Sequence, residues 1–279
     1  MIMKEKKKII VRLVGGLGNQ LFIYAFFLYL KKKTNHIIKL DNISGYQKLL
    51  FGNKYNQNFA LKNLKETNFS NSEDCFLGIA GKIKRLLIKN FVLFRYIFEV
   101  DYISEKNLLN DLQSLHLSKF NKIYIDGYFQ NIKYLKNNKK EIQGILKQIK
   151  YKKSFSNHKT LCILFSNYKY QNEYEKKKYL HNLKKFIKKN NFKKFIIFSI
   201  KKPNKLIQFL GKNKTKFIKP NSKKDALKNL YIMSKFKYYF IDNSTYHWWG
   251  AWFSKNEKKV VFIPKKNSNL LFYKNCKYY

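Results

Sequence analysis

Residues 242–252, with the sequence DNSTYHWWGAW, constrain the fold of this chain more than any other stretch. They follow a short apolar run at residues 238–241, which is typical of a buried strand. They continue into aromatic residues at helical spacing, which include Trp248, Trp249 and Trp252. The pattern therefore predicts a strand that ends, a polar turn, and a helix over residues 246–254.

The polar turn, which holds Asn243, Ser244 and Thr245, has two interpretations. A helix N-terminus presents unpaired N–H groups and a partial positive charge, so it can bind an anion such as phosphate. Ser, Thr and Asn are also the usual helix-capping residues, and spacing alone favours an ordinary cap. We expect the three tryptophans to support this turn as a packed wall.

The second half of the sequence alternates apolar runs with helical patterns. The runs that predict strands are residues 161–165, 195–200, 215–218, 238–241 and 260–263. The patterns that predict helices are residues 174–189, 205–210, 225–234 and 246–254. Such alternation predicts a parallel sheet with helices on both faces, in which ligands bind outside the carboxyl ends of the strands.

The first half begins with a strand, a glycine-rich loop and a buried helix. The predicted strand is residues 9–14, the loop is GGLGNQ at residues 15–20, and the helix is residues 21–33. This arrangement lets the backbone approach a phosphate or a sugar closely, although the glycines are also compatible with a simple tight turn. Their spacing matches neither the dinucleotide-binding nor the Walker pattern.

The remaining elements of the first half are less regular. A strand at residues 36–40 ends before Asp41, and a strand at residues 123–126 ends at Asp126. Residues 82–96 and 108–117 have helical spacing, and a lysine-rich helix extends to about residue 150. Residues 151–159 are the predicted linker, which divides the chain into domains at 1–150 and 151–279.

Charge and composition restrict the class of protein. The chain has 279 residues and a formal net charge of +43, which favours anionic partners. Lys, Asn, Ile, Phe and Tyr are all abundant, as in translation from an AT-rich genome. Nucleic-acid readers favour arginine, but the chain contains only Arg12, Arg85 and Arg95. A nucleic-acid-binding protein is therefore the least favoured class.

Metal binding and membrane insertion are not predicted. Cys75, Cys162 and Cys276 are scattered without metal-ligand spacing, which favours reduced thiols in a cytosolic protein. The basic start of the chain is followed by an apolar stretch that Arg12 interrupts, unlike a signal peptide. The longest apolar run, residues 21–30, has about half the length of a membrane span.

Several of these stretches resemble the signatures of one known family, the bacterial α-1,2-fucosyltransferases. GGLGNQLFIYAFFLYL at residues 15–30 resembles the amino-terminal signature. NSTYHWWGAWFSKNEKKVVFIPKKN at residues 243–267 resembles the carboxy-terminal one. DGYFQNIKYL at residues 126–135 matches a third element, and residues 230–234 loosely match a fourth.

The resemblance implies an α/β fold of GT-B type, in which two Rossmann-like domains with parallel sheets face a cleft. The first domain would lie on the acceptor side, and the second would bind the nucleotide sugar. The implied enzyme is a hexosyltransferase that transfers fucose from GDP-fucose to a galactose hydroxyl of a surface glycan, with inversion and without a metal. No Asp-x-Asp pair is present to hold a metal against a diphosphate. No cofactor is expected besides the donor.

The resemblance also implies a set of donor-binding residues. Ser244 and Thr245 would hold the β-phosphate, and the glycine-rich loop would face it from the first domain. The donor-binding residues are Gly16, Gly18, Asn19, Gln20, Asn243, Ser244 and Thr245, with Trp248, Trp249 and Trp252 as structural support.

One family motif is missing from the chain. The family has His-x-Arg-Arg-x-Asp-Tyr at the end of the first strand of the second domain, where an arginine is expected to bind the diphosphate. Residues 164–170 are LFSNYKY instead, and no arginine follows Arg95. Lys169 is the only basic group placed to compensate, but lysine lacks the planar two-pronged contact of arginine. Asn229 also replaces an acid that usually precedes the fourth element.

Three hypotheses therefore remain open. The first is an active fucosyltransferase or related glycosyltransferase, and the second is a degenerate paralogue with little or no activity that binds nucleotide or glycan. The third is a basic nucleic-acid-binding protein. The catalytic base is unassigned, with Asp41, Asp126 and Lys169 as weak candidates, and the acceptor is unassigned as well.

The first hypothesis carries expectations about partners and place. The partners would be a GDP-sugar and an oligosaccharide or lipid-linked glycan, together with peripheral contact to an anionic membrane. The expected location is the cytoplasm, at the inner face of the cytoplasmic membrane.

Overall fold

The structure is a computed structural model of the 279-residue chain. It describes residues 6–47, 59–61, 69, 76–108, 112–147, 149, 159–166, 173–219, 226–264 and 276–278. Most of the predicted linker at residues 151–159 lies outside the described residues. So does the loop that contains Asn167 and Lys169.

The chain divides into two compact units, Met1–Ile142 and Gln143–Tyr279. The sequence predicted the division after residue 150, whereas the contacts divide the chain within the helix α6 (Lys139–Lys147). Each unit contains its own parallel sheet and its own helices.

The first unit is built on a sheet of four parallel strands in the order β2-β1-β4-β3. The strands are β1 (Lys8–Arg12), β2 (Ile37–Asp41), β3 (Val100–Ser104) and β4 (Lys122–Asp126). The helix α1 (Leu17–Lys33) packs against β1 and β2 and is buried along most of its length, as its apolar sequence predicts. The helix α5 (Lys133–Lys136) packs on α1.

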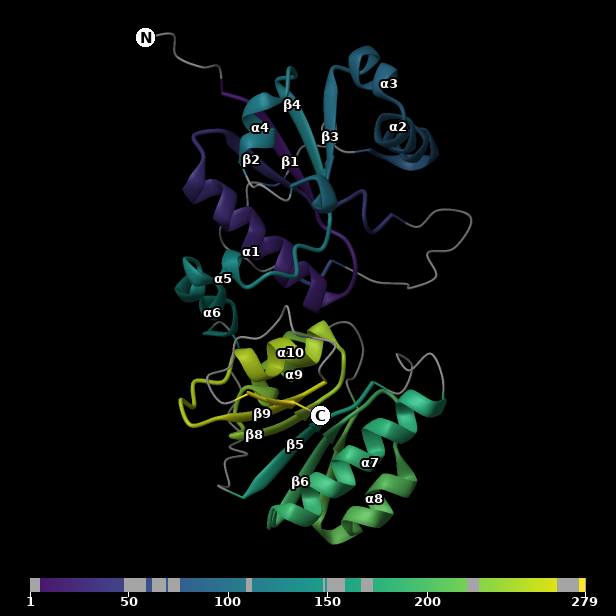
Figure 1. The fold of residues 1–279 in the computed structure, drawn as a ribbon, viewed down its shortest axis with the longest axis vertical. Coiled ribbons are helices and arrows are strands. Elements are labelled where there is room, and N and C mark those ends of the chain that lie inside the picture. Colours follow the sequence, from purple (N-terminus) through teal and green to yellow (C-terminus); the bar gives the residue numbers. More distant parts are fainter. Residues whose placement is uncertain are drawn as a thin grey trace. The chain divides into compact units, whose positions relative to one another are not determined.

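The helices α2 (Gly78–Asn90) and α3 (Val92–Ile97) lie beside β3 at the edge of this sheet (Figure 1). Residues 82–96 were predicted as one helix, but Phe91 is extended (φ −129°, ψ 122°) and separates the two. The strand β3 was not predicted, because Asp101 and Ser104 interrupt its apolar pattern. The remaining helices of this unit are the 3₁₀ helix η2 (Glu105–Leu108) and α4 (Gln113–Leu117).

The second unit is built on six parallel strands in the order β10-β9-β8-β5-β6-β7. The strands are β5 (Thr160–Leu164), β6 (Lys194–Phe198), β7 (Thr215–Ile218), β8 (Tyr238–Ile241), β9 (Val260–Ile263) and β10 (Cys276–Tyr278). All of them except β10 were predicted. The strands β5, β6 and β8 are buried along nearly their whole length, and strands buried on both faces form continuous apolar runs.

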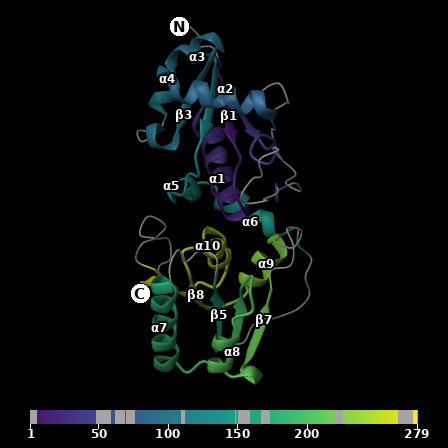
Figure 2. The ribbon, with the colours of Figure 1, turned by 90° about the vertical axis from the view of Figure 1, so that its right-hand side faces the viewer.

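Helices cover both faces of the second sheet (Figures 1 and 2). The helices α7 (Glu173–Lys189) and α8 (Asn204–Leu210) pack on one face, where Leu161, Ile163 and Phe240 form a core with Leu183 and Leu206. The other face holds α9 (Ala226–Met233) and α10 (Thr245–Trp252). A short 3₁₀ helix, η4 (Lys212–Lys214), precedes β7.

The predicted fold class is confirmed, since each unit is an α/β layer structure of Rossmann-like type with an all-parallel sheet. Within the described residues, every helix is too short or too polar to span a lipid bilayer.

Candidate functional site

The glycine-rich loop of the first unit is held in one conformation by its own neighbours. Gly15 has φ +83°, and a Cβ on it would lie 2.9 Å from Nδ2 of Asn19, so only glycine fits. Its carbonyl oxygen accepts a hydrogen bond from Nε2 of Gln20 at 2.9 Å. Gln20 is fully buried, and its Oε1 accepts the backbone N–H of Ala60 at 2.9 Å. The side chain of Gln20 therefore holds the loop in place.

The other predicted residues of this loop form the start of α1. Gly16 is the N-cap residue, and its carbonyl oxygen accepts the backbone N–H groups of Asn19 and Gln20 at 2.9 and 3.0 Å. Gly18 is buried in the first helical turn. The helix was predicted to begin at Leu21 but begins at Leu17, so the loop is shorter than the sequence predicts.

The loop after β4 lies beside the glycine-rich loop. Oδ1 of Asn19 accepts a hydrogen bond from Nε2 of Gln130 at 3.1 Å, and the ring of Tyr128 lies 3.3 Å from the position that a Cβ on Gly15 would take. Two of the stretches that carry the family resemblance therefore meet at the carboxyl edge of the first sheet. Neither Tyr128 nor Gln130 was predicted individually as a site residue.

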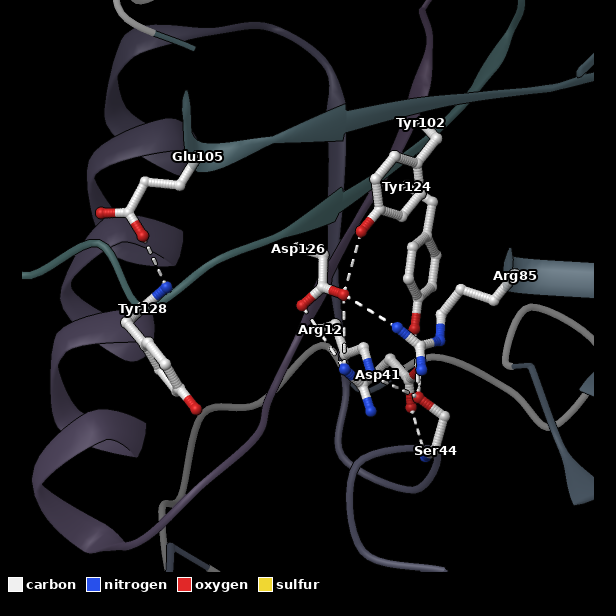
Figure 3. Close-up of polar contacts among 9 residues, drawn as sticks. All are labelled: Arg12, Asp41, Ser44, Arg85, Tyr102, Glu105, Tyr124, Asp126 and Tyr128. Atoms are coloured by element: carbon white, nitrogen blue, oxygen red, sulfur yellow. Dashed lines mark hydrogen bonds and ion pairs between the residues drawn. The ribbon is translucent and has the colours of Figure 1, made fainter. Parts of the chain in front are cut away.

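Asp126, the last residue of β4, is the centre of a cluster of charged and phenolic groups (Figure 3). Its Oδ2 lies 3.0 Å from Nη1 of Arg85 on α2 and 3.3 Å from Nη1 of Arg12 at the end of β1. The hydroxyl of Tyr102 on β3 donates to the same oxygen at 3.1 Å. The side chains of Asp126, Arg12 and Arg85 are only 13–17% exposed. Two of the three arginines of the chain thus converge on one carboxylate.

Asp41, the last residue of β2, is completely buried beside this cluster. Its Oδ1 accepts the backbone N–H groups of Ile43 and Ser44 at 3.0 and 2.9 Å. Its Oδ2 accepts the hydroxyls of Ser44 and Tyr124, each at 2.5 Å. The hydroxyl of Ser44 also accepts a hydrogen bond from Nε of Arg12 at 3.2 Å. Ser44 and Arg12 therefore connect the carboxylates of Asp41 and Asp126 (Figure 3).

The ionisation of this cluster follows from its burial and its charges. Burial alone would lower the pKa of Arg12, but Asp126, Tyr124 and Asp41 outweigh this effect and raise the pKa. Burial, together with the nearby carboxylates, also raises the pKa of the Tyr124 and Tyr102 hydroxyls. Both tyrosines are therefore neutral hydrogen-bond donors at neutral pH.

Both weak base candidates in the first unit are thus engaged in internal contacts. Each oxygen of Asp41 accepts two hydrogen bonds, and Asp126 is paired with two guanidinium groups. The structure therefore favours a structural role for Asp41 and Asp126, and Lys169 lies outside the described residues.

Glu105 is a carboxylate at the same edge that the sequence did not single out. It follows β3, its side chain is exposed, and its Oε2 accepts the backbone N–H of Tyr128 at 2.8 Å. It was missed because β3 was missed. Arg12 and Arg85 were missed for another reason: their common partner, Asp126, is distant from both in the sequence, although Arg12 does interrupt an apolar strand.

In the second unit, Asp242 connects the ends of two neighbouring strands. It follows β8 and is 1% exposed. Its Oδ2 accepts the backbone N–H of Ser166 after β5 at 2.5 Å. Its Oδ1 accepts the backbone N–H of Ser244 at 3.1 Å and lies 2.6 Å from Nδ1 of the buried His247 on α10. Asp242 and His247 were not predicted as site residues, although both lie in the stretch that dominates the sequence.

The three predicted phosphate-binding residues follow Asp242. Asn243 is exposed, Ser244 is 2% exposed, and Thr245 is partly exposed as the first residue of α10. Ser244 occupies the N-cap position, but its side chain makes no capping hydrogen bond. Ser244 therefore does not act as an ordinary side-chain cap in the structure. Phosphate binding by this turn stays a prediction.

The three tryptophans of α10 are buried and pack against one another. Trp248 and Trp249 are completely buried and Trp252 is 5% exposed. The ring centroids of Trp248 and Trp249 are 5.1 Å apart, and those of Trp249 and Trp252 are 5.0 Å apart. The helix packs closely on α9, because a Cβ on Gly250 would lie 2.7 Å from Sδ of Met233. The support of a ligand-binding turn before α10 by these tryptophans stays a prediction.

Two buried polar atoms of the second unit have no hydrogen-bond partner in the part of the chain that the structure describes. They are Oγ of Ser199, directly after β6, and Nδ2 of Asn229 on α9. No group of three or more His, Cys, Asp or Glu side chains among the described residues is arranged to hold a metal ion.

Comparison with known proteins relates the chain to glycosyltransferases. It is 25% identical over 281 residues to an α-1,2-colitosyltransferase of Escherichia coli, covering 92% of this chain and 91% of that protein. A segment of 38 residues is 50% identical to the O-antigen biosynthesis glycosyltransferase WbnK of Escherichia coli, which is 14% of this chain and 13% of WbnK. No protein-family profile matches the chain.

Solved structures with a related chain path include two fucosyltransferases. The α-1,6-fucosyltransferase NodZ, crystallised with GDP, has a TM-score of 0.48 at 12% identity and covers 89% of this chain and 92% of its own. A mutant of Arabidopsis thaliana FUT1 in complex with GDP has a TM-score of 0.48 at 11% identity and covers 93% of this chain and 70% of its own. The similarity that extends along nearly the whole sequence is therefore similarity to a glycosyltransferase.

Proposed function

We propose that the protein transfers fucose or the related sugar colitose from a GDP-sugar to a galactose hydroxyl of a surface glycan, with inversion and in an α-1,2 linkage. The observation that carries the proposal is the similarity to an α-1,2-colitosyltransferase along 92% of the chain. The motifs at residues 15–30, 126–135 and 243–267 support the same reaction class. In this proposal the first unit binds the acceptor and the second unit binds the donor.

The donor diphosphate is proposed to bind at the start of α10, through Asn243, Ser244, Thr245 and backbone N–H groups of the first helical turn. The burial of Trp248 and the hydrogen bonds of Asp242 support this proposal, because they hold the turn rigidly before any ligand arrives. Gly16, Gly18 and Asn19 are proposed as the donor contacts of the first unit, whereas Gln20 is already engaged in holding its loop.

Titration with GDP tests the donor site. Each hydroxyl that binds a charged phosphate oxygen contributes roughly 1–2 kcal/mol, so Ser244→Ala and Thr245→Ala should each weaken GDP binding by about five- to thirtyfold. Ser254→Ala is the matched control, because Ser254 is also buried and lies just beyond the same helix. Unchanged GDP affinity in the Ser244→Ala, Thr245→Ala double variant would refute the proposed site.

Measurement of GDP release from GDP-fucose and GDP-colitose, with galactose-terminated acceptors, tests the reaction. A missing charged clamp on the leaving phosphate reduces the rate by roughly 10²–10³, so we expect slow turnover. Asn167→Arg should then raise it. Restoring the family histidine at Leu164 is not advisable, because Leu164 is completely buried in β5. GDP binding without any turnover, unchanged by Asn167→Arg, would favour the degenerate paralogue instead.

We further propose that the protein works as a peripheral protein at the inner face of the cytoplasmic membrane, where lipid-linked glycan acceptors are found. The net charge of +43 supports this proposal, because anionic lipids attract basic surfaces.

A further inference from the structure

The helices α2 and α3 of the first unit expose an unusually large apolar surface. Of the fourteen large hydrophobic side chains that the described residues expose, seven lie on this helix pair and an eighth, Phe91, lies between the two helices. We call them the α2–α3 face: Ile79, Ile83, Leu86, Phe91, Val92, Leu93, Tyr96 and Ile97, which are 44–67% exposed. Exposed apolar patches of this kind mark surfaces that contact a protein or a membrane.

The α2–α3 face points away from the sheet because the opposite side of the helix pair is anchored to it. Ile88 is completely buried against β3 and β4. Arg85 on α2 binds Asp126 at 3.0 Å, and Arg95 on α3 binds Asp101 at 3.1 Å. In Figure 2, α2 and α3 are the described elements of this unit nearest the viewer. The sheet therefore leaves this apolar surface uncovered.

The exposed residues of α2 form one stripe with a basic border. Ile79, Ile83 and Leu86 follow i, i+4, i+7 spacing, which places them on the same side of a helix. Lys82 and Lys89 lie two turns apart on the border of the stripe, and both are exposed. The sequence from residue 78 to residue 98 contains no acidic residue and five basic residues, of which the three lysines remain besides the two arginines that pair with acids of the sheet. A basic, amphipathic surface of this composition is typical of helices that lie in the interface of an anionic membrane.

We propose that the α2–α3 face inserts its apolar side chains among the headgroups of an anionic membrane, while Lys82 and Lys89 bind lipid phosphates. This inference rests on the peripheral membrane contact proposed above and names the surface that makes it. A second copy of the chain fits less well. In a twofold dimer this face would meet itself and bring its lysines together, and the helix pair itself contains no acidic residue to neutralise them.

Cosedimentation with phosphatidylglycerol vesicles and with phosphatidylcholine vesicles tests the proposal. Because the whole chain is basic, each variant needs a control that carries the same number and kind of substitutions at exposed positions outside the α2–α3 face. The apolar variant carries Ile83→Ser, Leu86→Ser and Leu93→Ser, and its control carries Tyr174→Ser, Ile200→Ser and Phe209→Ser. The charge variant carries Lys82→Gln and Lys89→Gln, and its control carries Lys201→Gln and Lys202→Gln. All ten positions are exposed, so folding should persist, and circular dichroism verifies it.

The intact protein should bind phosphatidylglycerol vesicles and bind phosphatidylcholine vesicles weakly. The apolar variant should lose at least about tenfold in vesicle partitioning, since burial of apolar side chains supplies much of the affinity of interfacial helices. It should lose binding most clearly at about 0.5 M salt, where screening removes the electrostatic part. The two controls should keep the binding of the intact protein.

Two results would overturn the inference. If the controls lose as much binding as the variants, the contact is a general effect of the +43 charge, and peripheral attachment stands without the α2–α3 face. If light scattering shows a dimer that the apolar variant converts to a monomer, with vesicle binding unchanged, the face binds a second copy. Transfer from GDP-fucose to a soluble acceptor, measured on the same proteins, reports separately on the proposed enzymatic function.

Discussion

Replacement of Asp126 by Asn tests whether this residue organises the first unit or serves the chemistry. The substitution removes one negative charge that lies 3.0 Å from Arg85 and 3.3 Å from Arg12, and it weakens the hydrogen bond from Tyr102. Exposed ion pairs contribute about 0–1 kcal/mol. Breaking a fully buried pair costs about 3–5 kcal/mol, because a charge is left without a partner. At 13–17% exposure the cluster lies between these limits, and we expect a loss of about 2–3 kcal/mol.

For a unit of this size such a loss corresponds to a decrease in melting temperature of roughly 5–10 °C, measurable by differential scanning calorimetry. Glu141→Gln is the matched control, because its pair with Lys32 is 40–44% exposed and should contribute little. A double-mutant cycle of Asp126→Asn with Arg85→Gln should show strong coupling, because the second change removes one stranded charge. If Asp126→Asn leaves the stability unchanged but abolishes sugar transfer, the residue acts in the reaction and our structural assignment is wrong.

Three further predictions follow from burial and close packing. Trp248→Ala should lower the free energy of unfolding by about 3–5 kcal/mol, because the side chain is completely buried. Urea denaturation measures this loss, and a clearly smaller value would contradict the prediction. Gly250→Ala should lower the free energy of unfolding by about 1–3 kcal/mol, because the added methyl group crowds Met233. A smaller side chain at position 233 should restore part of this stability, and the absence of any recovery would contradict the explanation. Burial, with smaller effects of His116 and Lys7, lowers the pKa of His36 below its ordinary value of 6.5. The contribution of His36 to stability is therefore complete above about pH 6.5 and is lost as the pH falls. Unfolding of His36→Gln between pH 8 and pH 5 should therefore show a shallower decrease in stability than the parent, and an identical slope would exclude this group as the cause.

The sequence predicted the second unit better than the first, and the reason is burial. Strands such as β8 and β9 are covered on both faces, so their apolar runs stand out and their bounds were predicted without error. The edge strand β3 contains Asp101 and Ser104, which disguise it. Phe91 ends α2 although it continues the apolar pattern, so the local sequence carries no signal for the turn to α3.

The candidate site was predicted in part for a similar reason. Glycine-rich loops and the turn before α10 carry local signals, and both lie at carboxyl edges of parallel sheets, as expected. Contacts between distant residues carry no such signal. The convergence of Arg12 and Arg85 on Asp126 depends on the strand order, which cannot be inferred from spacing. Asp242 was noticed as part of a motif, but its bond to Ser166 requires the pairing of β5 with β8.

The pairing of β1 with β4 also has a consequence for how the chain is made. Arg12 and Asp126 are 114 residues apart, and β4 supplies the central neighbour of β1. During synthesis, β1 and the apolar helix α1 emerge from the ribosome long before β4, so β1 remains without this neighbouring strand while the chain grows. The pair β1–β2 can form early, but loop closure to β4 is slow because it joins distant segments. Nascent chains that stall before residue 122 should therefore bind chaperones, and release should follow once β4 has left the exit tunnel.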